Sequence, residues 1–182
     1  MKKLLFVPAL AVALFLASCG GGETKTDETT VATDSSAMQT PADEKPGADI
    51  PGIKDVAVTD HIELTGDDQL KFDKTLFKIK AGQDVKLSMK NIGKMPKAAM
   101  AHNVVILAPG TDVQAFGEAA VKATATDHIP ADMKSDVIAH TKLLGPGESD
   151  EITFKVTDPG VYDFICSFPG HFGTMRGKIV AE

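Results

Sequence analysis

The segment "VYDFICSFPGHFGTM", residues 161–175, carries the strongest structural signal in this 182-residue chain. Its first part alternates aromatic or apolar residues with others, which predicts a β-strand whose core face ends at Cys166. The Pro-Gly pair that follows is typical of a turn, and such a turn can bring His171 and Met175 back beside the cysteine. A metal site, a catalytic thiol, and an ordinary strand followed by a turn are all open at this point.

The same alternation recurs from residue 55 onward. The segments "DVKLSMKN" (84–91) and "EITFKV" (151–156) each place apolar side chains on one face and polar ones on the other. Turn segments rich in Gly, Pro and Asp separate the predicted strands, at residues 81–84, 108–112, 145–150 and 158–160. The pattern predicts an all-β sandwich.

One segment, residues 111–139, departs from the strand pattern. Thr111 or Asp112 can cap "VQAFGEAAVKA", and a polar stretch follows it. We therefore expect a short helix and a flap to be inserted between strands.

The N-terminus has the features of an export signal. Lys2 and Lys3 precede the apolar run "LLFVPALAVALFLA", which is too short and wrongly flanked for a typical membrane-spanning helix. The run ends in "LASC", which resembles the lipobox of bacterial lipoproteins, where the cysteine becomes the lipid-modified first residue. These features predict a signal peptide at residues 1–18 and lipidation of Cys19. A plain secretory signal cleaved near Ala17 is the alternative.

Residues 19–54 contain mainly Gly, Thr, Ser, Asp, Glu and Pro. Because such a segment cannot bury enough apolar surface to offset chain entropy, it predicts a disordered tether. Residues 55–182 are then the folded domain. The formal net charge of the whole chain is −6, and no basic patch with interleaved aromatic residues occurs, so no nucleic-acid partner is expected.

A second histidine, His102, begins an apolar segment far upstream of Cys166. One thiolate, two imidazoles and one thioether suit copper, since two His and one Cys form a trigonal plane with a weak axial Met. Zinc more often recruits a fourth strong ligand or a water molecule. A catalytic thiol would need a nucleophile elbow or a helix N-terminus beside it, and the sequence offers neither. The donor set therefore indicates electron transfer.

The chain from about Val58 to Glu182 resembles azurin, a family of bacterial blue copper proteins with the cupredoxin fold. The resemblance is carried by "DQLKF" (68–72), "MAHNVVIL" (100–107), "VIAHTKLLGPGESDEITFKV" (137–156) and "YDFICSFPGHFGTMRGKIV" (162–180). It implies a cupredoxin-type Greek-key β-sandwich with a short helix and flap insertion.

The resemblance also implies one copper ion that alternates between Cu+ and Cu2+. It assigns five ligands, namely His102, Cys166 and His171 as the strong ones, Met175 as the axial one, and the backbone carbonyl of Ala101 as a weak contact.

Further residues take roles around the ligands by the same resemblance. Asn103 ties the two ligand-bearing loops together, with a plain strand-end asparagine as its alternative, and Phe168 adjoins the ligands. The other histidines are predicted not to bind copper: His61, His128 and His140. The resemblance places four apolar residues near the exposed edge of the ligand histidine, where they are predicted to form a docking patch unless they serve only as core: Met95, Met100, Phe168 and Pro169.

The implied function is one-electron transfer between periplasmic redox partners such as c-type cytochromes. On this interpretation the protein is not an enzyme, has no small-molecule substrate, and is held on a bacterial membrane by the lipid on Cys19. The alternative is a periplasmic lipoprotein that binds and delivers copper.

Overall fold

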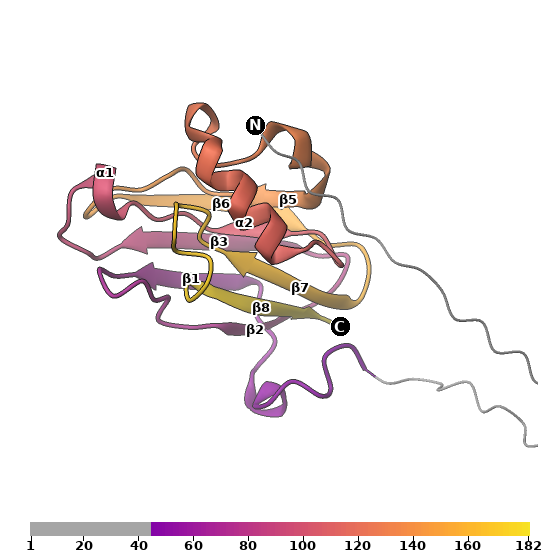
Figure 1. Cartoon of the computed structure of the whole chain (residues 1–182). Coiled ribbons are helices and arrows are strands. Elements are labelled where there is room, and N and C mark those ends of the chain that lie inside the picture. The colour runs from indigo at the N-terminus through magenta and orange to yellow at the C-terminus, as the bar shows by residue number, and fades with distance from the viewer. Residues whose placement is uncertain (1–44) are drawn as a thin grey trace, which may run out of the picture. The chain divides into compact units, whose positions relative to one another are not determined.

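The structure is a computed structural model that describes residues 45–182 (Figure 1). The predicted signal peptide, the lipidation site Cys19 and the predicted tether up to residue 44 lie outside the described residues. Within residues 45–182, no helix combines the length and the apolar character that crossing a bilayer requires.

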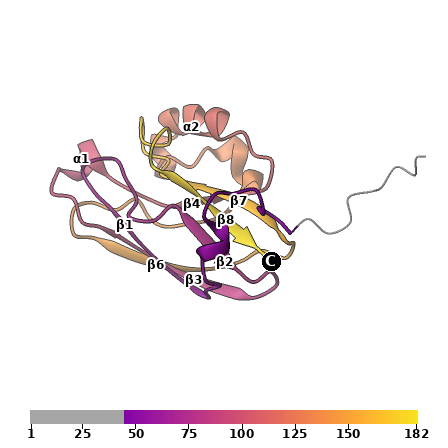
Figure 2. The same ribbon diagram turned by 90° about the horizontal axis from the view of Figure 1, so that it is seen from below.

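Two β-sheets pack face to face, which confirms the predicted β-sandwich (Figures 1 and 2). The three-stranded sheet has the order β1 (His61–Gly66), β3 (Asp84–Asn91) and β6 (Ser149–Lys155). The five-stranded sheet has the order β2 (Leu76–Ile79), β8 (Arg176–Ala181), β7 (Gly160–Ile165), β4 (Val105–Leu107) and β5 (Val137–His140). Because neighbouring strands are mostly not consecutive in the chain, the sheets bring distant segments together.

The main core lies between the sheets and follows the predicted alternation. In β3, the buried side chains are Val85, Leu87 and Met89, as the pattern indicated. In and directly after β7, Tyr162, Phe164 and Cys166 all belong to the same core cluster. The thiol therefore points into the sandwich together with the aromatic rings, as the sequence predicted.

A second, smaller core covers the outer face of the five-stranded sheet. It is formed by Val105, Leu107, Phe116, Ile129 and Ile165. These side chains come from two strands and from the predicted insertion, so the insertion packs on the sandwich.

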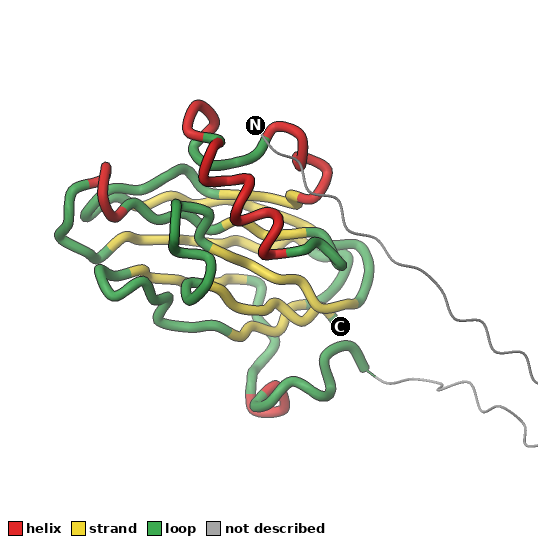
Figure 3. Tube along the Cα trace, in the orientation of Figure 1, coloured by secondary structure: helices red, strands yellow, loops and turns green. Residues whose placement is uncertain are grey.

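The insertion begins with helix α2 (Val113–Lys122) (Figure 3). Asp112 caps it, since its carboxylate accepts hydrogen bonds from the backbone N–H groups of Gln114 and Ala115. Two 3-10 helices follow, η2 (Thr124–Thr126) and η3 (Ala131–Asp136). The predicted insertion of a short helix followed by a flap is thus confirmed. We call residues 113–136, helix α2 included, the flap.

The ordered domain reaches further toward the N-terminus than the predicted boundary at residue 55. The 3-10 helix η1 (Ile53–Asp55) buries Ile53. Gly47, which has a φ of 69°, lies so close to Val161 and Val180 that an added Cβ would be 3.2 Å or less from both side chains. Gly47 and Ile53, which belong to the predicted tether, therefore pack on the domain. The low overall hydropathy of the segment concealed its few apolar residues.

The centre of the main core generates a first prediction. Phe164 is unexposed, and its ring centroid lies 5.5 Å from that of Phe72 and 5.8 Å from that of Phe77. Phe164→Ala should lower the free energy of unfolding of the copper-free protein by about 3–5 kcal/mol, because it leaves a cavity. The exposed Val121, replaced by Ala, should change it by less than about 0.5 kcal/mol. Urea denaturation measures both; equal effects would contradict this description of the core.

Candidate metal centre

His102 is held at the end of a short loop by backbone and ring contacts. It follows helix α1 (Lys97–Met100) and forms an isolated bridge with Leu144, with N···O distances of 3.0 and 2.7 Å. Its Nε2 lies 3.0 Å from the backbone carbonyl oxygen of Asp67. Since a carbonyl only accepts, Nε2 carries the proton, and Nδ1 keeps a lone pair that faces Cys166.

The other three predicted ligands lie in the loop that joins β7 to β8. The loop is closed by the Cys166 N–H, which donates to the carbonyl of Met175 over 2.9 Å. Within it, the N–H of Met175 donates to the carbonyl of His171 (2.8 Å), and that of His171 to Phe168 (3.0 Å). Gly170 has a φ of 82°, which only glycine adopts without strain, so the predicted Pro-Gly turn is present.

The two segments bring a thiol and two imidazoles together. Sγ of Cys166 lies 4.0 Å from Nδ1 of His102 and 3.5 Å from Nδ1 of His171. The three donor atoms all lie within 4.8 Å of one another. Two metal–ligand bonds of about 2.0–2.3 Å at roughly 120° would separate their donor atoms by about 3.8 Å, so the spacing fits one shared ion.

Met175 completes this donor set. Its side chain is unexposed, and a Cβ added at Gly66 would lie 2.6 Å from its Cε and 3.2 Å from Cδ2 of His102. The thioether therefore lies beside the histidine ring, in a space that the missing side chain of Gly66 leaves open. Because the set contains a thiol, two imidazoles and a thioether but no carboxylate, it fits copper better than zinc.

The four side chains are buried, and burial shifts the pKa values of three of them. It raises the pKa of the Cys166 thiol to about 11, although hydrogen bonds from the backbone of Asn103 and Phe168 oppose the rise. It lowers the pKa of His171 to about 4, with a smaller contribution from the nearby His102. It also lowers the pKa of His102, against the hydrogen bond to Asp67. At neutral pH the copper-free site therefore holds a protonated thiol and two neutral imidazoles.

Asn103 links the two ligand-bearing segments, in agreement with the predicted role. Its Nδ2 donates to Oγ of Ser167 over 2.8 Å, and its Oδ1 accepts from the Ser167 N–H over 2.9 Å. Both residues are buried, so water does not compete for these hydrogen bonds. The residues that follow His102 and Cys166 are thus fixed to each other.

Sequence reasoning missed Asn91, which supports the His102 loop from a third segment. Its Nδ2 donates to the carbonyls of Met100 (3.3 Å) and Leu144 (3.1 Å), and its Oδ1 accepts from the Gly93 N–H (2.8 Å). The one available signal was a polar residue at a core-facing position of the alternating segment 84–91. Such a residue needs hydrogen-bond partners, but the pattern does not say which.

The remaining predicted positions fall at different distances from the donors. Phe168 adjoins the site, since its ring centroid lies 4.8 Å from that of His171. His61 and His140 are exposed and lie outside the cluster of possible metal ligands. His128 also lies outside it and is buried. Ala101 is unexposed, and the contact of its carbonyl with copper stays a prediction.

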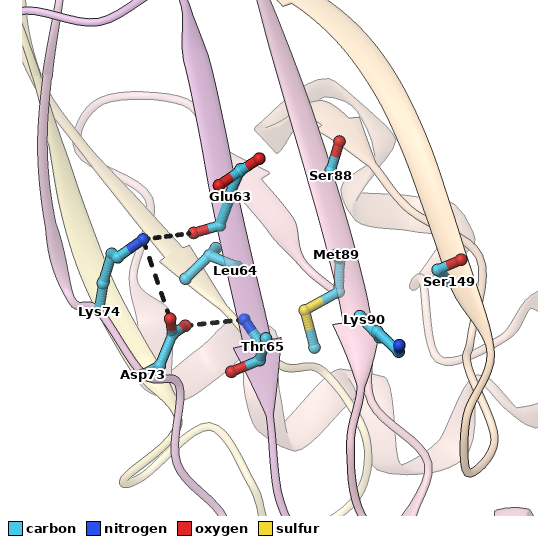
Figure 4. A pocket seen from close by; sticks show the side chains of 9 residues that line it. All are labelled: Glu63, Leu64, Thr65, Asp73, Lys74, Ser88, Met89, Lys90 and Ser149. Carbon is cyan, nitrogen blue, oxygen red and sulfur yellow. Dashed lines mark hydrogen bonds and ion pairs between the residues drawn. The ribbon is translucent and has the colours of Figure 1, made fainter.

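A surface hollow over β1 and β3 is separate from these ligands (Figure 4). Some of its polar groups are joined: Lys74 donates to the carbonyl of Glu63 (3.3 Å) and lies 3.9 Å from Asp73, which accepts from the Thr65 N–H (2.7 Å). None of the predicted ligands lines it.

The pKa values predict how copper binding depends on pH. Because the thiol is protonated below a pKa of about 11 while both imidazoles are neutral, binding should release one proton per ion at pH 7, and the apparent affinity should rise about tenfold per pH unit up to pH 10. Titration calorimetry in buffers of different ionisation enthalpy counts the protons. Release of two or more at pH 7 would show that an imidazole is protonated in the copper-free site.

Comparisons with known proteins agree with this site. Residues 59–182 match the family model of copper binding proteins, plastocyanin/azurin family. Azurin of Alcaligenes faecalis is 35% identical over 130 residues, which cover 65% of this chain and 94% of that protein. Outer membrane protein H.8 of Neisseria gonorrhoeae is 41% identical over 103 residues, which cover 55% of each chain.

Solved structures show the same relationship. Dithionite-reduced auracyanin of Roseiflexus castenholzii has a TM-score of 0.62 at 36% identity, over 69% of this chain and 99% of its own. An azurin of Methylomonas sp. strain J has a TM-score of 0.61 at 28% identity, over 67% and 97%. The cofactor is copper, and the four side chains are arranged as a single type 1 site. The matched family model and the buried Cys-His-His-Met set show that the chain belongs to the plastocyanin/azurin family of copper-binding proteins.

Proposed function

We propose that this protein is a one-electron carrier of the bacterial periplasm, held at a membrane by a lipid on Cys19. The observation that carries the proposal is the closed, buried set of one thiol, two imidazoles and one thioether. Copper, when bound, supplies a couple between Cu(I) and Cu(II) that gains and loses one electron. The chain contributes donors whose positions are fixed by hydrogen bonds to Asp67, Asn103 and the loop backbone.

The burial of the ligands suits electron transfer better than chemistry on a substrate. His102, Cys166 and Met175 have no exposed surface, and His171 is 3% exposed. An electron can pass through the edge of the His171 ring, whereas a substrate molecule would need an open position beside the donors. His171 is accordingly the ligand through which we expect partners to exchange electrons.

The proposed docking surface includes Phe168, whose ring adjoins this ligand. Of the four predicted patch residues, Met95 is 41% exposed, and the other three are half-buried: Met100, Phe168 and Pro169. Ile92, which is not among the predicted patch residues, is 52% exposed. The loop that contains Asp68 is hydrogen-bonded to the loop that contains Met95, since the carboxylate of Asp68 accepts from the N–H groups of Lys94 and Met95. A small apolar patch with charged neighbours suits brief contact with another redox protein, such as a c-type cytochrome.

The alternative, a lipoprotein that delivers copper, would need a site that releases the ion easily. No observation favours it, because the ligands are buried on two loops that are hydrogen-bonded together.

The copper assignment and the carrier function can be tested together. Cys166→Ser should abolish the intense visible absorption of the Cu(II) protein, because the thiolate is its source. Met175→Leu should keep copper and shift the reduction potential, because it removes the axial contact. In stopped-flow experiments the wild-type protein should exchange electrons with a c-type cytochrome much faster than it loses copper to a chelator. Rapid copper loss with slow electron exchange would instead support delivery.

The proposed membrane anchor is supported by the "LASC" pattern and by a relative named as an outer membrane protein, and it can be tested separately. Cys19→Ala should abolish labelling with radioactive palmitate and move the protein from the membrane fraction to the soluble fraction. Cys166→Ser is the matched control, because it removes the other cysteine and should leave the protein in the membrane fraction. Retention of the Cys19→Ala protein there would exclude the anchor.

A further inference from the structure

The flap contacts the loop that bears His171, and the first contact is made by Phe172. This residue follows the ligand directly and packs against the second core. Figures 1 and 2 both show the loop between β7 and β8 beside α2. A Cβ added at Gly117, in the middle of α2, would collide with the ring of Phe172. The ring is therefore seated on the bare backbone of the helix.

The second contact is made by His128. Its ring is 8% exposed and meets the ring of Phe168 edge-on, with centroids 5.3 Å apart and an interplanar angle of 72°. Phe168 lies in turn 4.8 Å from His171. Edge-on aromatic pairs of this kind are favourable beyond the area that they bury. A row of three rings thus leads from the flap to the ligand.

The backbone around His128 is strained. Asp127 has a φ of 51° and His128 a φ of 65°, values that residues with a Cβ rarely adopt. The conformation is held by the His128 N–H, which donates to the carbonyl of Ala123 (2.9 Å), and by Nδ1, which donates to the carbonyl of Ala120 (2.9 Å). Strained residues persist where their surroundings fix them, commonly near functional sites. Here the fixed conformation directs the ring onto Phe168.

We propose that the flap positions His171 for electron transfer, through the contacts Gly117–Phe172 and His128–Phe168. The ligand loop is closed at its base by the bond between Cys166 and Met175, and its two ends are held further by Asn103, which bonds Ser167, and by Thr174, which donates to the carbonyl of Leu70 (3.2 Å). Its tip gains support from the flap on two sides of the histidine. The ring of His171 would then keep one orientation in both oxidation states of bound copper. The ligands would therefore move little when an electron is transferred. The redox part of this inference rests on the proposed carrier function.

The central experiment replaces Gly117 by Ala. Since Ala favours a helix more than Gly does, a change that acted on the helix alone would leave the loop as it is. We expect the displaced Phe172 to loosen the loop, so that amide hydrogen exchange at the His171 N–H of the copper-free protein accelerates by roughly threefold to tenfold. The electron self-exchange rate of the copper-loaded protein should fall. Val121→Ala, at an exposed position of the same helix, is the matched control and should change neither.

The same substitution made in a Phe172→Ala protein tests whether its effect passes through the ring of Phe172. In a Phe172→Ala protein the methyl group that Gly117→Ala introduces has no ring to displace, so this substitution should then have little additional effect on either readout. His128→Ala tests the other contact, and it should accelerate exchange at His171 while the main-core amides keep their wild-type rates.

Two results would overturn the proposal. One is unchanged exchange at His171 in both Gly117→Ala and His128→Ala; the other is an effect of Gly117→Ala that is equally large with and without the ring of Phe172. A wild-type protein that transfers no electrons would refute the proposed function instead, because the exchange measurement on the copper-free protein does not depend on it.

Discussion

The metal centre depends on the register between two neighbouring strands. β7 and β8 pair Ile165 with Arg176, and the hydrogen bond between Cys166 and Met175 continues the pairing by one step. This register closes the ligand loop and places the thiol and the thioether on the core side of the sheet. A slip by one residue would turn Cys166 to the opposite face. The position of His171 follows from the same closure, because its loop is anchored at both ends by that pair.

The protein buries a thiol and two imidazoles away from water. Burial keeps the thiol protonated and the imidazoles neutral, as the shifted pKa values of Cys166 and His171 show. A metal ion that binds these side chains only in the folded state stabilises the fold. Rigid support by Asn91, Asn103 and the Asp67 carbonyl keeps the donors in place without the ion.

The five-stranded sheet serves two cores at once, and this explains the place of the insertion. In β4 and β7, alternate residues face the sandwich interior or the flap, so that Phe164 lies in the main core and Ile165 in the second. The ligand loop begins where these two cores meet. Its residues are accordingly divided, with Met175 in the main core and Phe172 against the second. His171 directly precedes Phe172 and is 3% exposed.

The strands, the helix cap at Asp112 and the donor set could be predicted from the sequence, because a period of two, a capping residue and metal-ligand chemistry are properties of short segments. His102 is a candidate donor from its residue type and position, and the resemblance of four segments to one family assigns the individual ligand roles. The sequence alone could not show that Ile53 is buried, that Asn91 supports the His102 loop, or that His128 packs on Phe168. These contacts join residues far apart in the chain through irregular loops, whose conformation follows no periodic pattern and is fixed only when the two sheets and the flap pack together.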